Sequence, residues 1–170
     1  MTNTPVTGGE REAALAKIVE LVKRINIGML TTESQGRLHS RPMSTNGEVE
    51  FDGDLWFFTY GNSHKVDQIQ ADPQVNVAFA DNRNHVYISL TGTARLVRDK
   101  AKIRELWRPS LKLYFPKGID EPDIALLKVS VDQAEYWDGS KSWLAQVVEM
   151  TRALATGTMP DLGENKKLNV

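Results

Sequence analysis

The chain has 170 residues, of which 41% are hydrophobic, and its formal net charge at pH 7 is −1. This length and this hydrophobic content are typical of one globular domain with a substantial core. The near-neutral charge gives no electrostatic support for binding to nucleic acid or to an anionic membrane, which favour strongly basic surfaces. The sequence contains no cysteine, which excludes disulfides, thiolate nucleophiles, iron–sulfur clusters and zinc sites built from thiolates.

The sequence also bears on location. No segment approaches the roughly 18 consecutive apolar residues of a membrane span, and residues 1–12 form no apolar signal segment. The absence of cysteine fits a reducing compartment. We therefore expect a cytoplasmic protein without a membrane partner.

The hydrophobic pattern predicts an alternation of helices and short strands, because apolar residues recur at helical spacing in some segments and in β-rich runs in others. In chain order, we expect a helix at 7–25, strands at 27–32 and 38–45 joined by a hairpin, a strand at 55–60, a helix at 63–72, strands at 75–80 and 85–97, a helix at 100–107, a strand at 124–136 and a helix at 143–157. Residues 1–9 and 159–170 are expected to be extended or mobile tails. Six short strands in a chain of this size favour a small antiparallel barrel with flanking helices, a mainly β protein of the α+β class in one domain spanning 1–170.

The segment from Leu55 to Ile69 carries the clearest functional signal. It runs from an apolar aromatic strand through a small polar loop into the first turn of an amphipathic helix. The loop brings Thr59 and Ser63, with the neighbouring pair His64-Lys65, to a helix start, where free N–H groups and the helix dipole attract anions. Hydroxyl, imidazole and ammonium donors suit a phosphate dianion. The alternative is that Ser63 merely caps the helix and that Lys65 is solvated.

A second cationic residue, Arg41, lies in the middle of the predicted strand 38–45. A lone arginine in a strand is more often a surface residue whose stem packs on a neighbour. Taken together, however, Arg41 and the spacing from Thr59 to Lys65 resemble the flavin site of the pyridoxamine 5′-phosphate oxidase-like flavoproteins, within which the general stress protein 26 group is the most similar. The resemblance extends over nearly the whole chain and includes the segments 106–109, 114–118, 126–129, 134–138 and 157–165.

The resemblance implies a six-stranded antiparallel split β-barrel that binds FMN non-covalently and forms a homodimer with the flavin between the subunits. It implies the following cofactor-binding residues: Arg41, Pro42, Met43, Ser44, Phe58, Thr59, Ser63, His64, Lys65 and Trp137. Trp137 or Trp107 of the partner is a candidate wall of the site, with core packing as the alternative for each. FAD, F420 and haem remain alternative cofactors, and we expect no metal site because His39 and His85 lie far apart without ligands at suitable spacing.

The sequence departs from the true oxidases at three places. It has His64-Lys65 where they usually have Arg-Lys, Asn46 where they have a lysine, and a C-terminus without their Arg-x-His element. We therefore do not expect oxidation of pyridoxamine 5′-phosphate. Two functions remain open: an oxidoreductase whose small-molecule redox substrate is unidentified and whose catalytic residues the sequence does not reveal, and a non-catalytic stress protein that buffers flavin. We interpret the acidic cluster Asp120, Glu121 and Asp123 as a solvated loop.

Overall fold

The computed structural model describes residues 8–45, 53–139 and 164–169, and it describes side chains over residues 16–45 and 53–139. The helices are α1 (Gly8–Ile25), α2 (His64–Ala71) and α3 (Lys100–Leu106), followed by two short 3₁₀ helices, η1 (Pro109–Leu113) and η2 (Gly118–Asp120). The strands are β1 (Ile27–Ser34), β2 (Arg37–Ser44), β3 (Asp54–Tyr60), β4 (Gln74–Asp81), β5 (Val86–Val97), β6 (Ile124–Asp138) and β7 (Glu164–Asn169).

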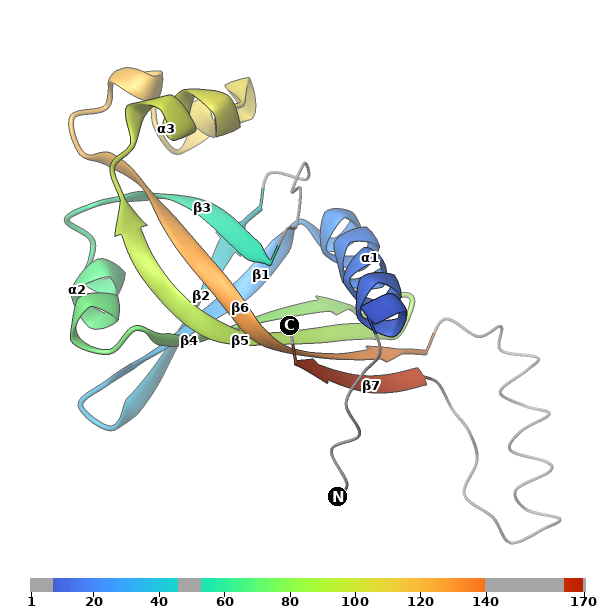
Figure 1. Ribbon diagram of the computed structural model, residues 1–170. Coiled ribbons are helices and arrows are strands. Elements are labelled where there is room, and N and C mark those ends of the chain that lie inside the picture. Colours follow the sequence, from blue (N-terminus) through green and yellow to red (C-terminus); the bar gives the residue numbers. More distant parts are fainter. Residues whose placement is uncertain (1–7, 46–52, 140–163, 170) are drawn as a thin grey trace, which may run out of the picture.

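The strands form one antiparallel sheet in the order β2-β1-β4-β5-β6-β3, which curls into a half-barrel (Figure 1). The two edge strands, β2 and β3, are neighbours in the sequence but do not pair with each other in the sheet. A register shift between Thr91 and Gly92 bends β5 against β6, and a Cβ at Gly92 would overlap the carbonyl oxygen of Ser130. The predicted six-strand antiparallel architecture is confirmed.

The C-terminal tail differs from its prediction, because Glu164–Asn169 forms a seventh strand, β7. β6 has 15 residues; its residues 124–130 pair with β3, and its residues 133–138 pair with β7. Pairing at a free strand edge needs only backbone donors and acceptors, so a polar segment without strand-like alternation can join. At the other terminus, α1 begins at Gly8, so residues 8 and 9 are helical and not part of a tail. The predicted helix at 143–157 lies outside the described residues.

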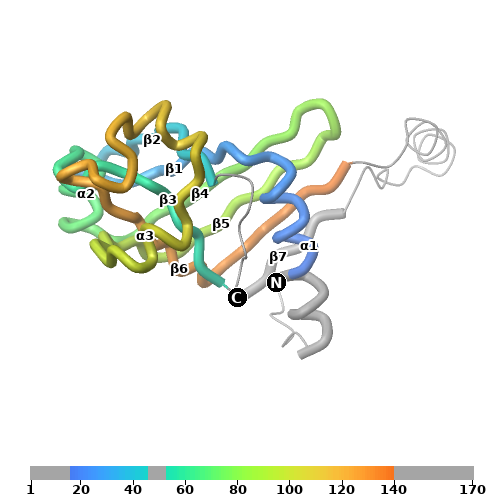
Figure 2. Tube along the Cα trace, turned by 90° about the horizontal axis from the view of Figure 1, so that it is seen from above, coloured from blue at the N-terminus to red at the C-terminus, as the bar shows by residue number. Residues whose placement is uncertain are grey.

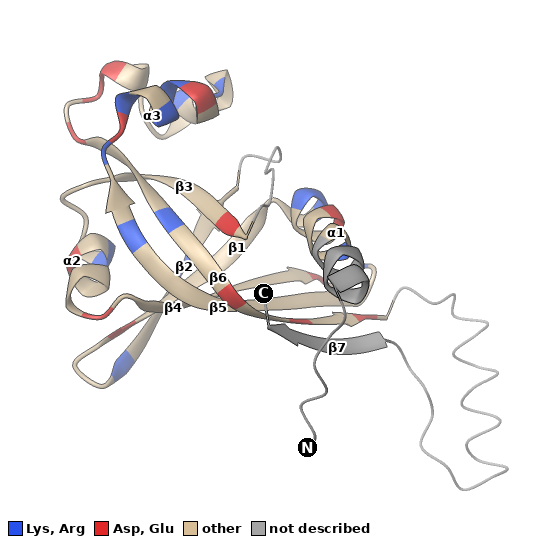
Figure 3. Ribbon diagram, viewed as in Figure 1, with Lys and Arg blue, Asp and Glu red and all other residues tan. Residues whose placement is uncertain are grey.

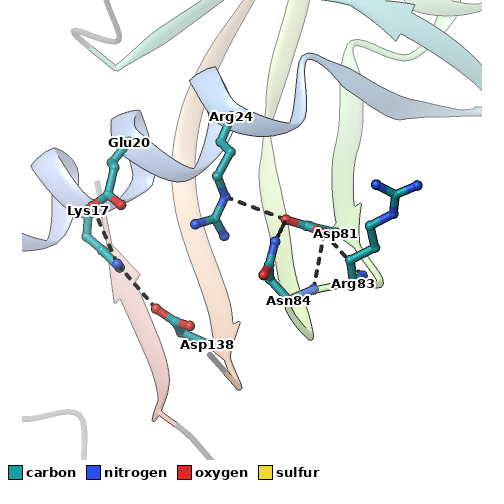
Figure 4. Close-up of polar contacts among 7 residues, drawn as sticks. All are labelled: Lys17, Glu20, Arg24, Asp81, Arg83, Asn84 and Asp138. Carbon is teal, nitrogen blue, oxygen red and sulfur yellow. Dashed lines mark hydrogen bonds and ion pairs between the residues drawn. The ribbon is translucent and has the colours of Figure 1, made fainter. Parts of the chain in front are cut away.

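The helix α1 packs against the barrel through Ile18, Leu21 and Val22, which are fully buried. Two ion pairs fix its polar side: Lys17 Nζ lies 3.2 Å from Asp138 Oδ2, and Arg24 Nε lies 3.5 Å from Asp81 Oδ2 (Figure 4). The helix α2 lies at the opposite end of the half-barrel from α1 in both views (Figures 1 and 2), and its Val66 and Ile69 pack on the same cluster inside the barrel. This leaves α2 clear of α1 and places it beside β1.

The strand β3 separates two hydrophobic clusters because successive side chains of a strand point to opposite faces. Leu55 and Phe57 belong to the cluster inside the barrel. Phe58 belongs to the second cluster, with Trp56 and Tyr60 packed against it. That second cluster also takes in Ile103 from α3 and, from the following segment, Leu111 and Phe115, and so fixes this segment over the edge strand.

Candidate functional site

A cavity of about 390 Å³ lies at the split of the barrel, between the edge strands β2 and β3 and the η1 segment. Its volume falls within the range of about 300–1,000 Å³ that is usual for small-molecule sites. Its lining is formed by Ile27, Pro42, Met43, Ser44, Phe58, Thr59, Tyr60, Lys65, Leu111, Tyr114 and Phe115. Of the ten predicted cofactor-binding residues, six line this cavity: Pro42, Met43, Ser44, Phe58, Thr59 and Lys65.

The polar end of the cavity is built around Lys65 at the start of α2. Lys65 Nζ donates hydrogen bonds to Thr59 Oγ1 at 3.1 Å and to Ser63 Oγ at 3.2 Å. Ser63 occupies the N-cap position of α2, but its side chain makes no capping hydrogen bond. The interpretation of Ser63 as a simple cap and of Lys65 as a solvated lysine is therefore wrong, because both side chains are directed into one donor cluster.

Arg41 lies close to this cluster from the opposite edge strand. Its Nη1 donates to Thr32 Oγ1 at 2.7 Å, and its Nη2 donates to Gln68 Oε1 at 2.8 Å. Burial lowers the pKa of Arg41. Burial, and secondly the positive charge of Arg41, lower the pKa of Lys65. Arg41 is thus not the solvated surface residue that a lone arginine in a strand usually is.

Neither cation is neutralised by a neighbouring acid within the described part of the chain. The ion pairs found there involve other residues, and no described carboxylate lies within 4.0 Å of Arg41 or Lys65. Two partly buried cations, close enough for the charge of Arg41 to lower the pKa of Lys65, are costly unless an anion joins them. With the hydroxyls of Thr59 and Ser63 and the first turn of α2, they form a donor set that fits a phosphate dianion.

The apolar end of the cavity is an aromatic wall between β3 and η1. The rings of Tyr60 and Phe115 lie 4.9 Å apart, those of Phe58 and Phe115 lie 6.0 Å apart, and Trp107 meets Phe58 edge-on at 5.7 Å. Tyr60 Oη donates to the carbonyl oxygen of Tyr114 at 3.0 Å, which ties the wall to the edge strand. Trp107 therefore packs in the second hydrophobic cluster of its own chain. This agrees with the core-packing alternative for this residue.

Besides Ile27 and Tyr60, three lining residues were not predicted as site residues: Leu111, Tyr114 and Phe115. Their sequence spacing of three and four positions is that of one face of a helical turn. This spacing predicts a helical turn with an apolar face. It does not predict that this face packs over β3, outside the barrel interior.

The loop between β3 and α2 is held by Asp123, at the start of the segment leading into β6. Asp123 Oδ2 accepts from the backbone N–H of Asn62 at 2.7 Å, and Asp123 O accepts from the N–H of Gly61 at 2.9 Å. Arg98 Nη1 donates to Asp123 Oδ1 at 2.8 Å, and this hydrogen bond is the main reason why the pKa of Asp123 is lowered. The Arg98 guanidinium occupies the space that a Cβ at position 61 would need, so any side chain there would require Arg98 to move. Asp123 is solvent-accessible, as the interpretation as a solvated loop expected, and it also anchors the loop between β3 and α2, which the sequence did not indicate.

Four predicted site residues lie outside the cavity lining: Arg41 and Ser63, which belong to the polar cluster beside it, and His64 and Trp137. The His64 side chain is fully exposed, and its Nδ1 lies 3.9 Å from Asp67 Oδ2. Trp137 lies near the end of β6, opposite Tyr87 and Asn165, and is 37% exposed. Asn46 lies outside the described residues. Within the described ranges, no three side chains of the metal-ligating types come together, and no helix is both long enough and apolar enough to span a membrane.

Comparisons with known proteins identify the family of this chain. The model of the family described as pyridoxamine 5′-phosphate oxidase like matches residues 13–161. The chain belongs to this family. It is 27% identical over 139 residues to the protein bli-3 of Neurospora crassa, in an alignment that covers 76% of this chain and 66% of bli-3. It is 24% identical over 118 residues to general stress protein 26 of Bacillus subtilis, covering 66% of this chain and 80% of that protein.

Two solved structures are similar over most of the chain. A general stress protein 26 from Jannaschia sp. CCS1 matches with a TM-score of 0.74 at 24% identity, covering 94% of this chain and 99% of that one. The general stress FMN/FAD binding protein of Xanthomonas citri matches with a TM-score of 0.69 at 27% identity, covering 79% of this chain and 94% of that one. The split-barrel fold and the relation to general stress protein 26 are thus established.

Proposed function

We propose that the chain is an FMN-binding protein of the general stress type, with the FMN phosphate between Arg41 and Lys65 and the flavin ring in the cavity at the barrel split. The observation that carries this proposal is the pair of partly buried cations without a described carboxylate partner, at the polar end of an otherwise apolar and aromatic cavity. The similar Xanthomonas citri protein, which is named as binding FMN or FAD, supports a flavin as the ligand.

The residues have separable roles in this proposal. Arg41, Lys65, Thr59 and Ser63 bind the phosphate, and the exposed His64 can add a donor only by reorienting its side chain. Pro42, Met43 and Ser44 follow one side of the ring, where Pro42 lacks an N–H and fits an edge strand. Phe58, together with the η1 wall, shields the other side from water. When bound, FMN supplies hydride or single-electron transfer, and the chain binds, orients and shields it.

We further propose a C2 homodimer, with the outer face of the sheet as the contact. Ile27 and Met29 are 51% and 41% exposed, and Tyr87 and Trp137 lie on the same outer face. Charged residues lie within β5 and β6 as well as on the helices (Figure 3), and Glu135 is two residues before Trp137 on this face. Exposed apolar residues that gather on one sheet face favour a protein contact. Ile27 also lines the cavity, so a second copy on this face would adjoin the flavin and could contribute its Trp137.

Oxidoreductase activity towards an unidentified small molecule is the first function we propose for the bound flavin. A specific observation keeps non-catalytic flavin binding as the second candidate. No carboxylate or imidazole is among the described residues that line the cavity, so this part of the chain supplies neither group for general acid–base catalysis there. Cytoplasmic location remains a prediction from the sequence.

Rapid-mixing kinetics of the FMN-loaded protein with NADH or NADPH, followed by quinones or oxygen, distinguishes the two functions. Reduction and reoxidation within a catalytic cycle would support the oxidoreductase, whereas a flavin that neither nicotinamide reduces would favour the binding protein. The absorption spectrum of the purified protein distinguishes a flavin from F420 and from haem.

A further inference from the structure

Gln68 lies next to the proposed phosphate site and contacts Arg41, which is far from it in the sequence. It is three residues after Lys65 on α2 and therefore shares a helix face with it. Its Oε1 accepts two hydrogen bonds, from Arg41 Nη2 at 2.8 Å and from Thr32 Oγ1 at 2.7 Å. Thr32 Oγ1 in turn accepts from Arg41 Nη1 at 2.7 Å. Arg41, Thr32 and Gln68 thus form a closed ring of hydrogen bonds.

The ring fixes the orientation of the guanidinium. Thr32 is buried, with 1% of its surface exposed, so one side of the ring is anchored in the barrel wall. A guanidinium has five N–H donors. Three are directed to Thr32 Oγ1, to Gln68 Oε1 and, at 3.4 Å, to the carbonyl oxygen of Leu30. Two donors have no acceptor among the described residues, and they are available to a ligand.

The chemical nature of residue 68 matters because it accepts from Arg41 without a negative charge. A carboxylate at the same position would form a charge-assisted pair with the guanidinium and compensate its charge. The carboxamide holds Arg41 in place and leaves its positive charge uncompensated. Arg41 lies near enough to Lys65 for its charge to lower the pKa of that lysine. An anionic ligand then meets two cations, and an uncharged ligand gains little from them.

We propose that Gln68 is a positioning residue that holds Arg41 with its charge uncompensated and thereby makes the site select phosphorylated over unphosphorylated flavins. This inference rests on the proposed binding of FMN in the cavity. It adds a residue that touches no part of the flavin and acts only through Arg41.

The test compares Gln68→Glu with Gln70→Glu. Both substitutions add one negative charge to α2, but Gln70 is exposed and makes no contact with Arg41 among the described interactions. The dissociation constants for FMN and riboflavin are measured by quenching of flavin fluorescence. We expect Gln68→Glu to lower the affinity for FMN about tenfold or more, since it cancels the charge of one of two phosphate-binding cations. The affinity for riboflavin should change less than about threefold. Gln70→Glu should change either affinity less than about threefold, because an exposed charge is screened.

Gln68→Met separates position from charge, since it removes the acceptor but adds no charge. It should weaken FMN less than Gln68→Glu does. The melting temperature of the flavin-free Gln68→Glu protein should equal or exceed that of the wild type, because an ion pair with Arg41 replaces a hydrogen bond to an uncharged acceptor. A selective loss of FMN binding is then not a folding defect.

Equal losses of FMN affinity in Gln68→Glu and Gln70→Glu, or equal losses for FMN and riboflavin in Gln68→Glu, would overturn the inference while leaving the proposed function intact. A wild-type protein that binds no FMN would refute the proposed function, and this inference with it.

Discussion

Replacing Lys65 by methionine separates binding of the phosphate from stability of the fold. Methionine keeps an unbranched apolar stem of similar length and removes the ammonium. Lys65 Nζ has three N–H donors, of which two are directed to Thr59 Oγ1 and Ser63 Oγ, so one is free for the phosphate. Losing one charge-assisted hydrogen bond costs about 1.5–3 kcal/mol, which is about a tenfold to hundredfold weaker affinity for FMN. Riboflavin, which has no phosphate, should bind with nearly unchanged affinity.

The same substitution should not destabilise the flavin-free protein. Burial and the charge of Arg41 lower the pKa of Lys65, so the folded state binds the proton less tightly than the unfolded state does. The charged lysine therefore costs stability at pH values below its folded-state pKa, and stability rises as pH increases between the folded and unfolded pKa values. We expect the melting temperature of the Lys65→Met protein at neutral pH to equal or exceed that of the wild type.

Fluorescence titration with FMN and riboflavin, combined with a thermal melt, checks both expectations. Lys112→Met is a matched control, because Lys112 is exposed on η1 and lies outside the cavity lining. Equal weakening of FMN and riboflavin, or a clear fall in the melting temperature of the flavin-free protein, would refute the assignment of Lys65 to the phosphate.

Three further predictions follow from the same site. Asp123→Ala should weaken FMN severalfold, because the loop carrying Ser63 loses its anchor at Asn62; an unchanged dissociation constant in the same titration would show that the loop holds its shape without Asp123. Light scattering at micromolar concentration should give the mass of a dimer, whereas a monomer that still binds FMN tightly would contradict a site shared between subunits. Pyridoxamine 5′-phosphate should not be oxidised even with FMN bound, since Lys65 is the one cation among the described lining residues; steady formation of pyridoxal 5′-phosphate in an absorbance assay would contradict this.

The parts of the fold that depend on local pattern could be predicted from the sequence. The strand around Phe58 and the helix after Ser63 follow from an apolar aromatic run, a polar loop and an amphipathic turn, and the structure has both within one residue of the expected bounds. β7 could not be predicted, because its sequence is polar and it is recruited by the free edge of β6. A strand of that kind is determined by its partner and not by its own alternation.

The site itself was predictable only in part, for the same reason. The cluster of Thr59, Ser63 and Lys65 is local in sequence and is assembled as expected. The contact between Arg41 and Gln68 joins residues 27 positions apart, and Asp123 reaches Asn62 across 61 positions. Such contacts depend on how the sheet curls, and no local spacing encodes them.

Titration of the flavin-free protein with FMN, followed by absorbance and by quenching of flavin emission, tests the central claim most directly. We expect saturable binding of one FMN per chain at micromolar concentration or below, with a shifted flavin spectrum. An FMN spectrum that stays that of the free flavin at micromolar protein, without saturation, would contradict the account.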